Sequence, residues 1–418
     1  MDSLTQIALG SAVAALTAPA RHRRIALAAG AVLGTLPDLD IIPLALLGVD
    51  PVDFVTWHRG PSHSLFVLAL VGWLLWLLLR RSWTPVREAP TRWFWAIEMA
   101  LLTHPLLDAF TVYGTQLFWP LPGRPVMGAS IFIIDPAYTV PLLAACAAAW
   151  WLRGRRSATL WLLAGVCLST AYLAWSLAAK VIVEREVQRA LVAEGLQHAP
   201  RFSVPMPFNT LLWRVVVMTP DGFLESERSI VVDRRPMIFR RYASDRGALE
   251  AVSAWPPVQR LDWFTLGFLK AERRDGRLVL SDLRMGAEPD YVFRYVVAES
   301  NGEGNWQRIA VERLAWRSGE RFRLAGLWRR IWNEPNPEEA GIEDDALGAF
   351  RDVVAPRGPR SGCFRFEPAR NPGQESGLNV GRVCLAGPRA RARPLWPSWW
   401  PGPRLVSSDR SSTPASCH

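Results

Sequence analysis

The chain has 418 residues, half of them apolar, and a formal net charge of +10. Eleven arginines against four acidic residues in 351–418 supply +7 of that charge, so residues 1–350 are close to balanced. This distribution argues against a basic nucleic-acid-binding surface. The five cysteines lie in apolar segments or in the C-terminal tail, which excludes a small disulfide-stabilised scaffold.

Long apolar segments dominate the first 183 residues. A transmembrane helix needs about 20 residues, within a range of about 17 to 25, and helices satisfy their own backbone hydrogen bonds in lipid. The sequence therefore predicts a membrane α-helical region, residues 1–183, with about six transmembrane helices. The six segments are 4–19, 25–47, 63–80, 93–112, 132–152 and 158–182.

The loops between these segments alternate in charge, with ten arginines on one side and two, Arg59 and Arg124, on the other. The positive-inside rule places the arginine-rich loops in the cytoplasm and the N-terminus outside. Everything after the sixth segment then lies on the periplasmic side of a bacterial inner membrane. Lys180 argues weakly against this orientation, although its ammonium can snorkel to the interface. The ten arginines are Arg21, Arg23, Arg24, Arg80, Arg81, Arg87, Arg92, Arg153, Arg155 and Arg156.

Beyond the helical region the pattern changes to strands. Leu211–Met218 is rich in Val and Leu, and Asp221-Gly222 and Asp275-Gly276 are typical hairpin turns. Residues 184–345 are therefore predicted to form a small, mainly β (α+β) soluble domain. Residues 346–418 are rich in Pro, Gly, Arg and Ser and are predicted to be a disordered tail.

Acidic and histidine side chains in the membrane half are the candidates for chemistry. Ionisable groups within spans are costly unless they are paired or bound to a metal. Charge counting alone fixed the orientation, and it places all of them near the outer face. They are Asp2, Asp38, Asp40, His58, His63, His104, Asp108 and Asp135.

The local spacings fit a metal site. His104 and Asp108 are four residues apart and share a helix face. Asp38 and Asp40 would diverge on a regular helix, but Pro37 can kink the chain and turn both inward. Imidazole and carboxylate together suit zinc, iron or manganese, which polarise phosphoryl or carbonyl oxygens and activate water. The fork of Arg59 matches a phosphate group.

Each of these features also has a structural interpretation. Asp38 and Asp40 can simply end a helix, and His58 and His63 flank a Gly-Pro turn at the interface. Asp2 and Asp135 are placed where a carboxylate stabilises the N-terminal end of a helix. Only the convergence of all these groups on one side favours a functional site.

Four polar motifs stand out in the membrane half. They are Met1-Asp2-Ser3-Leu4-Thr5-Gln6, Leu36-Pro37-Asp38-Leu39-Asp40, His58-Arg59-Gly60-Pro61-Ser62-His63-Ser64 and His104-Pro105-Leu106-Leu107-Asp108. These motifs resemble the YdjM-like family, which is described as inner-membrane, metal-dependent hydrolases, some of them labelled LexA-binding. The resemblance is dense over residues 1–140 and continues more loosely into the soluble domain. It implies that Asp38, Asp40, His58, His63, His104 and Asp108 are the metal ligands. A LexA-binding role does not fit motifs that face outward.

The sequence thus predicts an inner-membrane metal-dependent hydrolase, most simply a zinc enzyme, acting at the outer face on a lipid or lipid-linked phosphoester. Arg59 would hold a phosphate oxygen, and Asp2 or Asp135 would act as base. Amide hydrolysis, a proton- or metal-ion-coupled transporter, and a membrane-anchored binding module are the alternatives. The expected partners are membrane lipids, with no nucleic acid, and the oligomeric state is not predicted.

Overall fold

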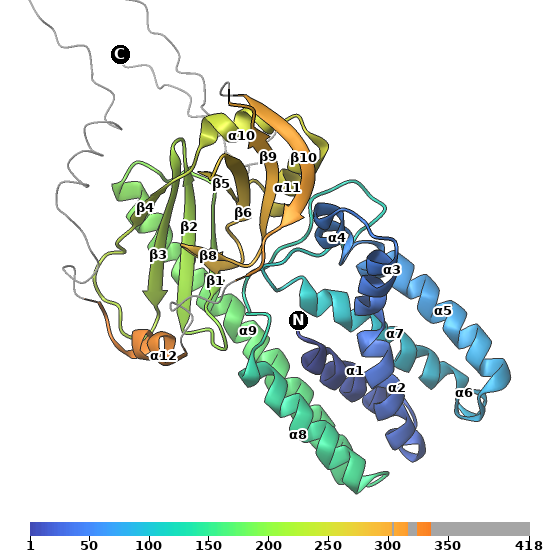
Figure 1. Ribbon diagram of the computed structural model, residues 1–418. Coiled ribbons are helices and arrows are strands. Elements are labelled where there is room, and N and C mark those ends of the chain that lie inside the picture. Colours follow the sequence, from blue (N-terminus) through green and yellow to red (C-terminus); the bar gives the residue numbers. More distant parts are fainter. Residues whose placement is uncertain (303–304, 317–323, 336–418) are drawn as a thin grey trace, which may run out of the picture. The chain divides into compact units, whose positions relative to one another are not determined.

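The computed structural model describes residues 1–302, 305–316 and 324–335, and its N-terminal half is helical (Figure 1). Five of the six predicted apolar segments each correspond to one helix, whereas the segment 25–47 is divided into an α-helix, a 3-10 helix and a second, short α-helix. The predicted tail and residues 336–345 lie outside the described residues. The helical elements are α1 (Ser3–Thr17), η1 (Ala20–His22), α2 (Arg23–Thr35), η2 (Leu36–Asp40), α3 (Ile41–Leu46), α4 (Pro51–Trp57), η3 (Pro61–His63), α5 (Leu65–Ser82), α6 (Thr84–Glu88), α7 (Pro90–Asp108), α8 (Pro136–Leu152) and α9 (Arg156–Ala193).

The prediction of about six transmembrane helices is not supported. Within the residues that the structure describes, three segments are long and apolar enough to cross a membrane: Ala20–Leu46, Leu65–Ser82 and Arg156–Ala193. Helices α1 and α8 are apolar but have only 15 and 17 residues. At 1.5 Å per residue they extend about 22 and 25 Å, less than the hydrocarbon thickness of about 30 Å. Helix α7 is long enough but carries Glu98, His104 and Asp108.

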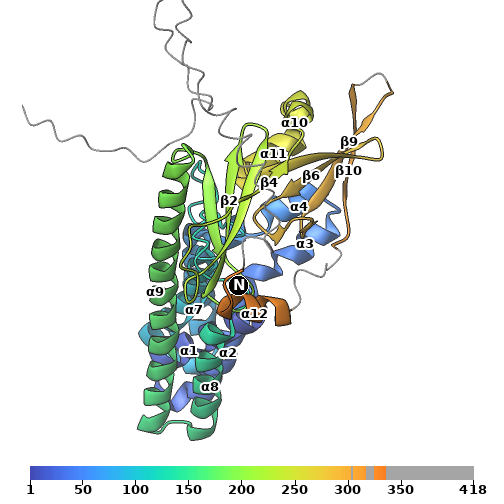
Figure 2. The same ribbon diagram turned by 90° about the vertical axis from the view of Figure 1, so that its left-hand side faces the viewer.

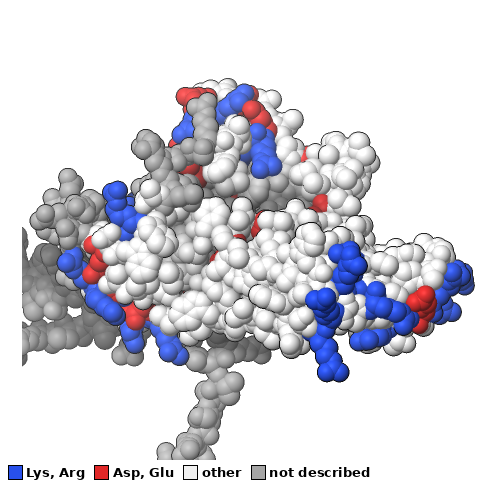
Figure 3. All heavy atoms as spheres, turned by 90° about the horizontal axis from the view of Figure 1, so that it is seen from below, with Lys and Arg blue, Asp and Glu red and all other residues white. Residues whose placement is uncertain are grey.

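The arginine-rich loops meet at one end of the helices. Arg23 donates from Nη1 to the carbonyl oxygens of Arg153 and Arg155 at 2.9 and 3.1 Å. Arg21 of η1 forms an ion pair with Glu88 of α6 at 3.0 Å. Figure 3 shows basic side chains gathered over this end of the helices. Because consecutive helices alternate in direction, the C-terminal ends of α2 and α7 lie at the opposite end.

Lys180 of α9 does not snorkel. Its Nζ donates to the carbonyl oxygens of Ala129 and Ser203, at 3.1 and 2.7 Å. The ammonium therefore joins α9 to the loop before α8 and to strand β1 (Arg201–Pro205). Since its charge is satisfied inside the protein, Lys180 is no longer an argument against the predicted orientation.

Helices α1 and α2 pack backbone to backbone through glycines. A Cβ atom on Gly30 would lie 2.2 Å from the carbonyl oxygen of Gly10. A Cβ on Gly34 would lie 2.5 Å from the carbonyl oxygen of Gln6. Small residues permit this close approach of apolar helices. The packing fixes Gly34, whose carbonyl group faces the site described below.

The second half of the described chain is β-rich, as predicted. It forms two four-stranded antiparallel sheets, in the orders β1-β2-β3-β4 and β10-β9-β6-β5, and the small pair β7-β8. Its further elements are β2 (Leu212–Thr219), β3 (Gly222–Ser229), β4 (Arg240–Ala243), α10 (Arg246–Val252), α11 (Pro256–Thr265), β5 (Leu269–Arg274), β6 (Arg277–Asp282), β7 (Gly286–Ala287), β8 (Asp290–Tyr291), β9 (Arg294–Ser300), β10 (Trp306–Arg313) and α12 (Leu324–Trp332).

Both predicted hairpins are present. Asp275 and Gly276 have φ values of 52° and 74° and form the two-residue turn between β5 and β6. Two left-handed residues are what a type I′ turn requires. The other turn lies one residue earlier than predicted, because Gly222 already pairs with Thr219 in the ladder of β2 and β3.

The β-rich region shares a core with the segment that follows α7. Tyr113 and Val55 of α4 belong to one apolar cluster with α11 and the sheet of β5, β6 and β9. Figures 1 and 2 both show α4 beside α11 and β10. Arg284, buried beside Asp282, donates from Nη1 to the carbonyl oxygen of Tyr113 at 2.9 Å. The loop after α7 is therefore held by both halves of the described chain.

The contact between α1 and α2 yields a first prediction. Gly30→Ala places a methyl group against the Gly10 carbonyl and should lower the free energy of unfolding by about 1–3 kcal/mol. Thermal unfolding in detergent measures the effect. Gly154→Ala is the matched control, because its nearest contact would be an ordinary 3.6 Å. Equal unfolding temperatures for the two variants would contradict this account of the packing.

Candidate metal centre

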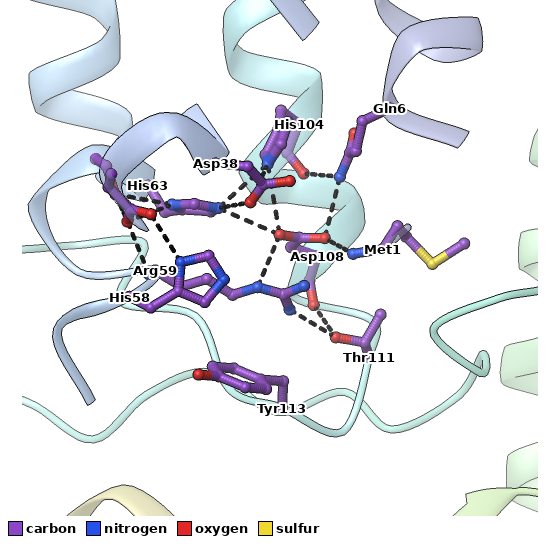
Figure 4. Close-up of polar contacts among 12 residues, drawn as sticks. Met1, Gln6, Asp38, His58, Arg59, His63, His104, Asp108, Thr111 and Tyr113 are labelled. Carbon is purple, nitrogen blue, oxygen red and sulfur yellow. Dashed lines mark hydrogen bonds and ion pairs between the residues drawn. The ribbon is translucent and has the colours of Figure 1, made fainter. Parts of the chain in front are cut away.

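Four side chains from three elements converge at the end of the helices opposite the arginine-rich loops (Figure 4). Asp38 comes from η2, His63 from η3, and His104 and Asp108 from the last two turns of α7. One ligand atom from each lies within 4.8 Å of all the others. His63, His104 and Asp108 are fully buried, whereas the Asp38 side chain is 20% exposed.

The distances among these atoms fit a bound cation. The two histidine Nε2 atoms lie 3.2 Å apart. Asp38 Oδ1 lies 3.3 and 3.4 Å from them, and Asp108 Oδ2 lies 3.3 and 3.6 Å from them. A tetrahedral ion with ligands at about 2.0–2.2 Å has ligand–ligand edges of about 3.3–3.6 Å. Five of the six edges of such a site are therefore present.

Hydrogen bonds on the far side of each imidazole set its tautomer. His104 Nδ1 lies 2.5 Å from the Gly34 carbonyl oxygen, which can only accept a hydrogen bond, so Nδ1 carries the proton. His63 Nδ1 lies 3.0 Å from Ser62 Oγ, whose own proton is donated to Asp40. Nδ1 of His63 is thus a donor as well, and both neutral rings present an Nε2 lone pair to the cluster.

The two carboxylate oxygens that face these lone pairs accept no hydrogen bond of good geometry. They are Asp38 Oδ1 and Asp108 Oδ2, and both are buried. Arg59 Nε lies 3.1 Å from Asp108 Oδ2, and the amino group of Met1 pairs with the other oxygen of Asp108, but no cation faces Asp38 Oδ1 and the two Nε2 lone pairs among the described residues. These electron-rich atoms repel one another in a low-dielectric site. A divalent cation removes that repulsion, so the donor set and its burial fit a metal ion.

Asp40 and His58, which the family resemblance implied as ligands, lie outside the four-residue cluster. His58 Nδ1 pairs with Asp40 Oδ1 at 2.7 Å, and Asp40 Oδ2 accepts from Ser62 Oγ and from the backbone N–H of Arg59. Asp38 and Asp40 diverge because residues two apart on a helical turn point in different directions. Pro37 does not turn both inward. Asp40 instead supports His63 through Ser62.

Arg59 is buried beside the cluster and held from three sides. Its Nε lies 3.1 Å from Asp108 Oδ2, and Nη1 donates to Thr111 Oγ1 at 3.1 Å. The guanidinium carbon lies 4.7 Å from the centre of the Tyr113 ring. The backbone of Arg59 is left-handed, with φ of 62°, which is uncommon for a residue other than glycine. Such backbone conformations occur often at functional sites.

Asp2 and Asp135, the predicted bases, act as helix caps. Asp2 accepts from the backbone N–H and the hydroxyl of Thr5, at 3.1 and 2.5 Å, at the start of α1. Asp135 accepts from the Ala137 N–H at 3.0 Å and from the Tyr172 hydroxyl at 2.9 Å. Their structural interpretation therefore accounts for both, and neither joins the four clustered residues.

Sequence reasoning missed several groups around the site. The Gly34 carbonyl is a backbone group, so no side chain in the sequence indicates its contact with His104. Gln6 belongs to the first motif, and its Nε2 donates to Asp108 Oδ1 at 3.0 Å. The amino group of Met1 forms an ion pair with the same oxygen. Glu98 of α7 is also buried, and neither of its carboxylate oxygens has a hydrogen-bond partner. Its charge within an apolar segment was a visible signal.

Comparison with known proteins identifies the helical region. Residues 1–183 match the sequence model of the family described as YdjM inner membrane protein, which confirms the predicted resemblance over that part of the chain. Inner membrane protein YbcI of Escherichia coli (strain K12) is 37% identical over 94 residues, which are 22% of this chain and 51% of that protein. The uncharacterized protein YfhP of Bacillus subtilis (strain 168) is 24% identical over 234 residues, 53% of this chain and 67% of that protein. No solved structure matches.

The geometry predicts the metal content of two variants. The full-length protein in detergent should carry close to one equivalent of zinc, iron or manganese by mass spectrometry of the metal. His104→Ala should lose most of it, since removal of a ligand costs the metal one of four donors. His58→Ala, matched in chemistry but outside the cluster, should retain it. Equal loss in both variants would contradict the four-residue centre.

Proposed function

We propose that this protein is a metal-dependent hydrolase of the inner membrane that cleaves a lipid or lipid-linked phosphoester at the outer membrane face. The observation that carries the proposal is the convergence of two histidine Nε2 lone pairs and two buried carboxylate oxygens that accept no hydrogen bond. Membership of residues 1–183 in an inner membrane protein family supports the location.

The proposed ligands are Asp38, His63, His104 and Asp108. Two imidazoles with two carboxylates suit zinc first, and iron or manganese also accept this donor set. A divalent ion held there would supply Lewis acidity toward a phosphoryl oxygen and toward water. Asp38 is the one partly exposed member of the four, so a substrate would approach from its side.

Arg59 is proposed to bind the anionic group of the substrate. A guanidinium presents donors in a plane that matches two phosphate oxygens, and burial strengthens such contacts. Tyr113 beneath the guanidinium and Thr111 at Nη1 keep its orientation fixed. Because Arg59 Nε already contacts Asp108, an anion bound by the remaining donors would lie next to the metal ligands.

The pair of His58 and Asp40 is the best candidate for proton transfer. Asp40 holds His58 Nδ1 at 2.7 Å, which leaves Nε2 as the atom that exchanges a proton. The His58 ring lies 5.8 Å, centre to centre, from the His63 ring. A carboxylate behind an imidazole orients it and stabilises its charged form. The carboxylates of Asp2 and Asp135 already accept hydrogen bonds as helix caps, so they are less suited to this role.

Exposed apolar side chains next to the centre support a lipid substrate. Helix α3 follows Asp40 directly and has no buried residue. Ile42, Leu46 and Leu47 are 52%, 82% and 74% exposed. Apolar surface of this kind is stable in lipid and costly in water. A substrate with an acyl or prenyl chain would therefore find apolar surface beside the exposed edge of the metal centre.

A second candidate, a proton- or metal-ion-coupled transporter, is favoured by one observation. Glu98 lies buried in the middle of α7, and its carboxyl group meets Gly72 of α5 rather than a cation. An unpaired acid at that depth is typical of a proton-binding site. The transporter would require ionisable groups along a path across the membrane, whereas the four ligands lie at one end of the helices.

The hydrolase proposal predicts a specific effect of Arg59→Lys. In proteoliposomes that contain phosphatidic acid or a polyprenyl phosphate, the protein should release phosphate, and a chelator should abolish the release. Arg59→Lys keeps the charge but loses the fork, so its kcat/KM should fall about 100-fold while the metal is retained. Arg124→Lys, on the same predicted side and exposed, should match the wild type. Turnover by the chelated protein would exclude the metal-dependent mechanism.

The proposed orientation has its own test. If the arginine-rich loops lie in the cytoplasm, as predicted, a reporter fused after Gly195, beyond α9, lies in the periplasm. Alkaline phosphatase should be active at that position and green fluorescent protein should be dark. The same pair of reporters after Arg155 should give the opposite result. Periplasmic signal at Arg155 and cytoplasmic signal at Gly195 would reverse the topology and remove the outer-face site.

A further inference from the structure

Helix α12 presents two tryptophans outward beside two arginines. Trp328 and Trp332 are 63% and 46% exposed, and their rings meet edge to face at 5.6 Å. Arg329 lies between them in sequence and is exposed as well. Tryptophan and arginine together are typical of helices that lie in the headgroup region of a bilayer.

The opposite face of α12 is fixed to the β-rich region. Leu327 and Ile331 are buried against Met206 and Leu212. Arg330 forms an ion pair with Asp233 at 2.6 Å. The helix therefore cannot rotate to bury its tryptophans without breaking these contacts. These contacts therefore keep both indole rings exposed at the surface.

The loop between β1 and β2, which packs against α12, is hydrogen-bonded to α9 near the end of the apolar part of α9. Thr210 Oγ1, in the loop between β1 and β2, accepts from Trp175 Nε1 and contacts the Tyr172 hydroxyl, both at 3.2 Å. Trp175 follows Arg156 by 19 residues, which on a helix is about 28 Å. That distance is close to one hydrocarbon thickness of about 30 Å. The loop therefore lies at the membrane interface if Arg156 marks the other one.

Further apolar groups are exposed in this loop and on α9 beyond Trp175. Phe208 in this loop is 40% exposed and lies 6.2 Å, ring to ring, from Phe132 before α8. Val181 and Ile182 of α9 are 50% and 43% exposed. The apolar surface of α9 thus continues up to the region where α12 is attached. These contacts connect α12 with the proposed lipid-facing surface of a candidate span.

We propose that α12, with Phe208 of the adjoining loop, is an interfacial anchor that inserts Trp328 and Trp332 among the lipid headgroups and acyl ends of the leaflet nearest the metal centre. The occupant of this surface is the bilayer in which α9 is already embedded. Arg329 binds lipid phosphates there. The anchor holds the β-rich region down against the membrane, and it stands independently of the hydrolase proposal.

The test places a fluorophore on the proposed anchor and on a control position. In a full-length variant without its native cysteines, Trp328→Cys or Trp332→Cys carries an environment-sensitive label in phosphatidylcholine–phosphatidylglycerol nanodiscs. Ala254→Cys, exposed in the turn between α10 and α11, is the control. Quenching by lipid with a nitroxide near the headgroup should be at least about threefold stronger at 328 and 332 than at 254.

The reverse pattern would overturn the proposal. Equal quenching of all three labels by aqueous iodide, with none by nitroxide lipid, would leave α12 in water. Protection from both quenchers would show that protein, either another part of this chain or a second copy, covers the tryptophans instead of lipid. A thermal unfolding temperature in detergent equal to that of the wild type confirms that each labelled variant is folded.

Discussion

The pairing of buried negative charge with a positive counterpart is the constraint on which this structure depends. Asp38 and Asp108 lie among apolar helices, where an uncompensated carboxylate costs several kcal/mol. Arg59 and the amino group of Met1 supply positive charge beside Asp108, and a cation at the proposed metal centre would also neutralise Asp38 and bind the histidine lone pairs. The glycine contact of α1 and α2, the hydrogen bond from His104 to Gly34, and the support of His63 by Ser62 and Asp40 all serve the same end. They hold four candidate ligand atoms within 4.8 Å of one another, at distances that suit a single metal cation.

Much of the candidate site was predictable because its signals are local. His104 and Asp108 are one turn apart on one helix, and charge in an apolar segment is easy to see. The arginine counts predicted that the groups gather opposite the arginine-rich loops, and the contacts of Arg21 and Arg23 confirm that these loops share one end of the helices. The mainly β character of the second half followed from the Val- and Leu-rich segment Leu211–Met218 and from turns such as Asp275-Gly276.

Other features depend on geometry that the sequence does not display. Whether Asp38 and Asp40 face the same way depends on how η2 bends, and His58 pairs with Asp40 from a separate segment. The count of about six spans is not supported, because α1 is short, α7 carries ionisable side chains, and apolar residues of the preceding loop lengthened the segment predicted for α8. The partners of Tyr113 lie at Phe264 and Phe293, and no local pattern indicates contacts over such separations.

The position of Tyr113 has a consequence for the biogenesis of the protein. The four proposed ligands are complete once residue 108 has been synthesised, yet the ring beneath Arg59 packs against Phe264 and Phe293. At ribosomal speeds of about 5–20 residues per second, that packing is delayed by on the order of ten to forty seconds. During this interval the nascent helices already contain the donor set, while the surface that orients the arginine is still missing. If the proposed metal centre and anion-binding role of Arg59 hold, uptake of the ion and completion of the surface that orients this arginine are therefore separate events in the assembly of the newly made chain.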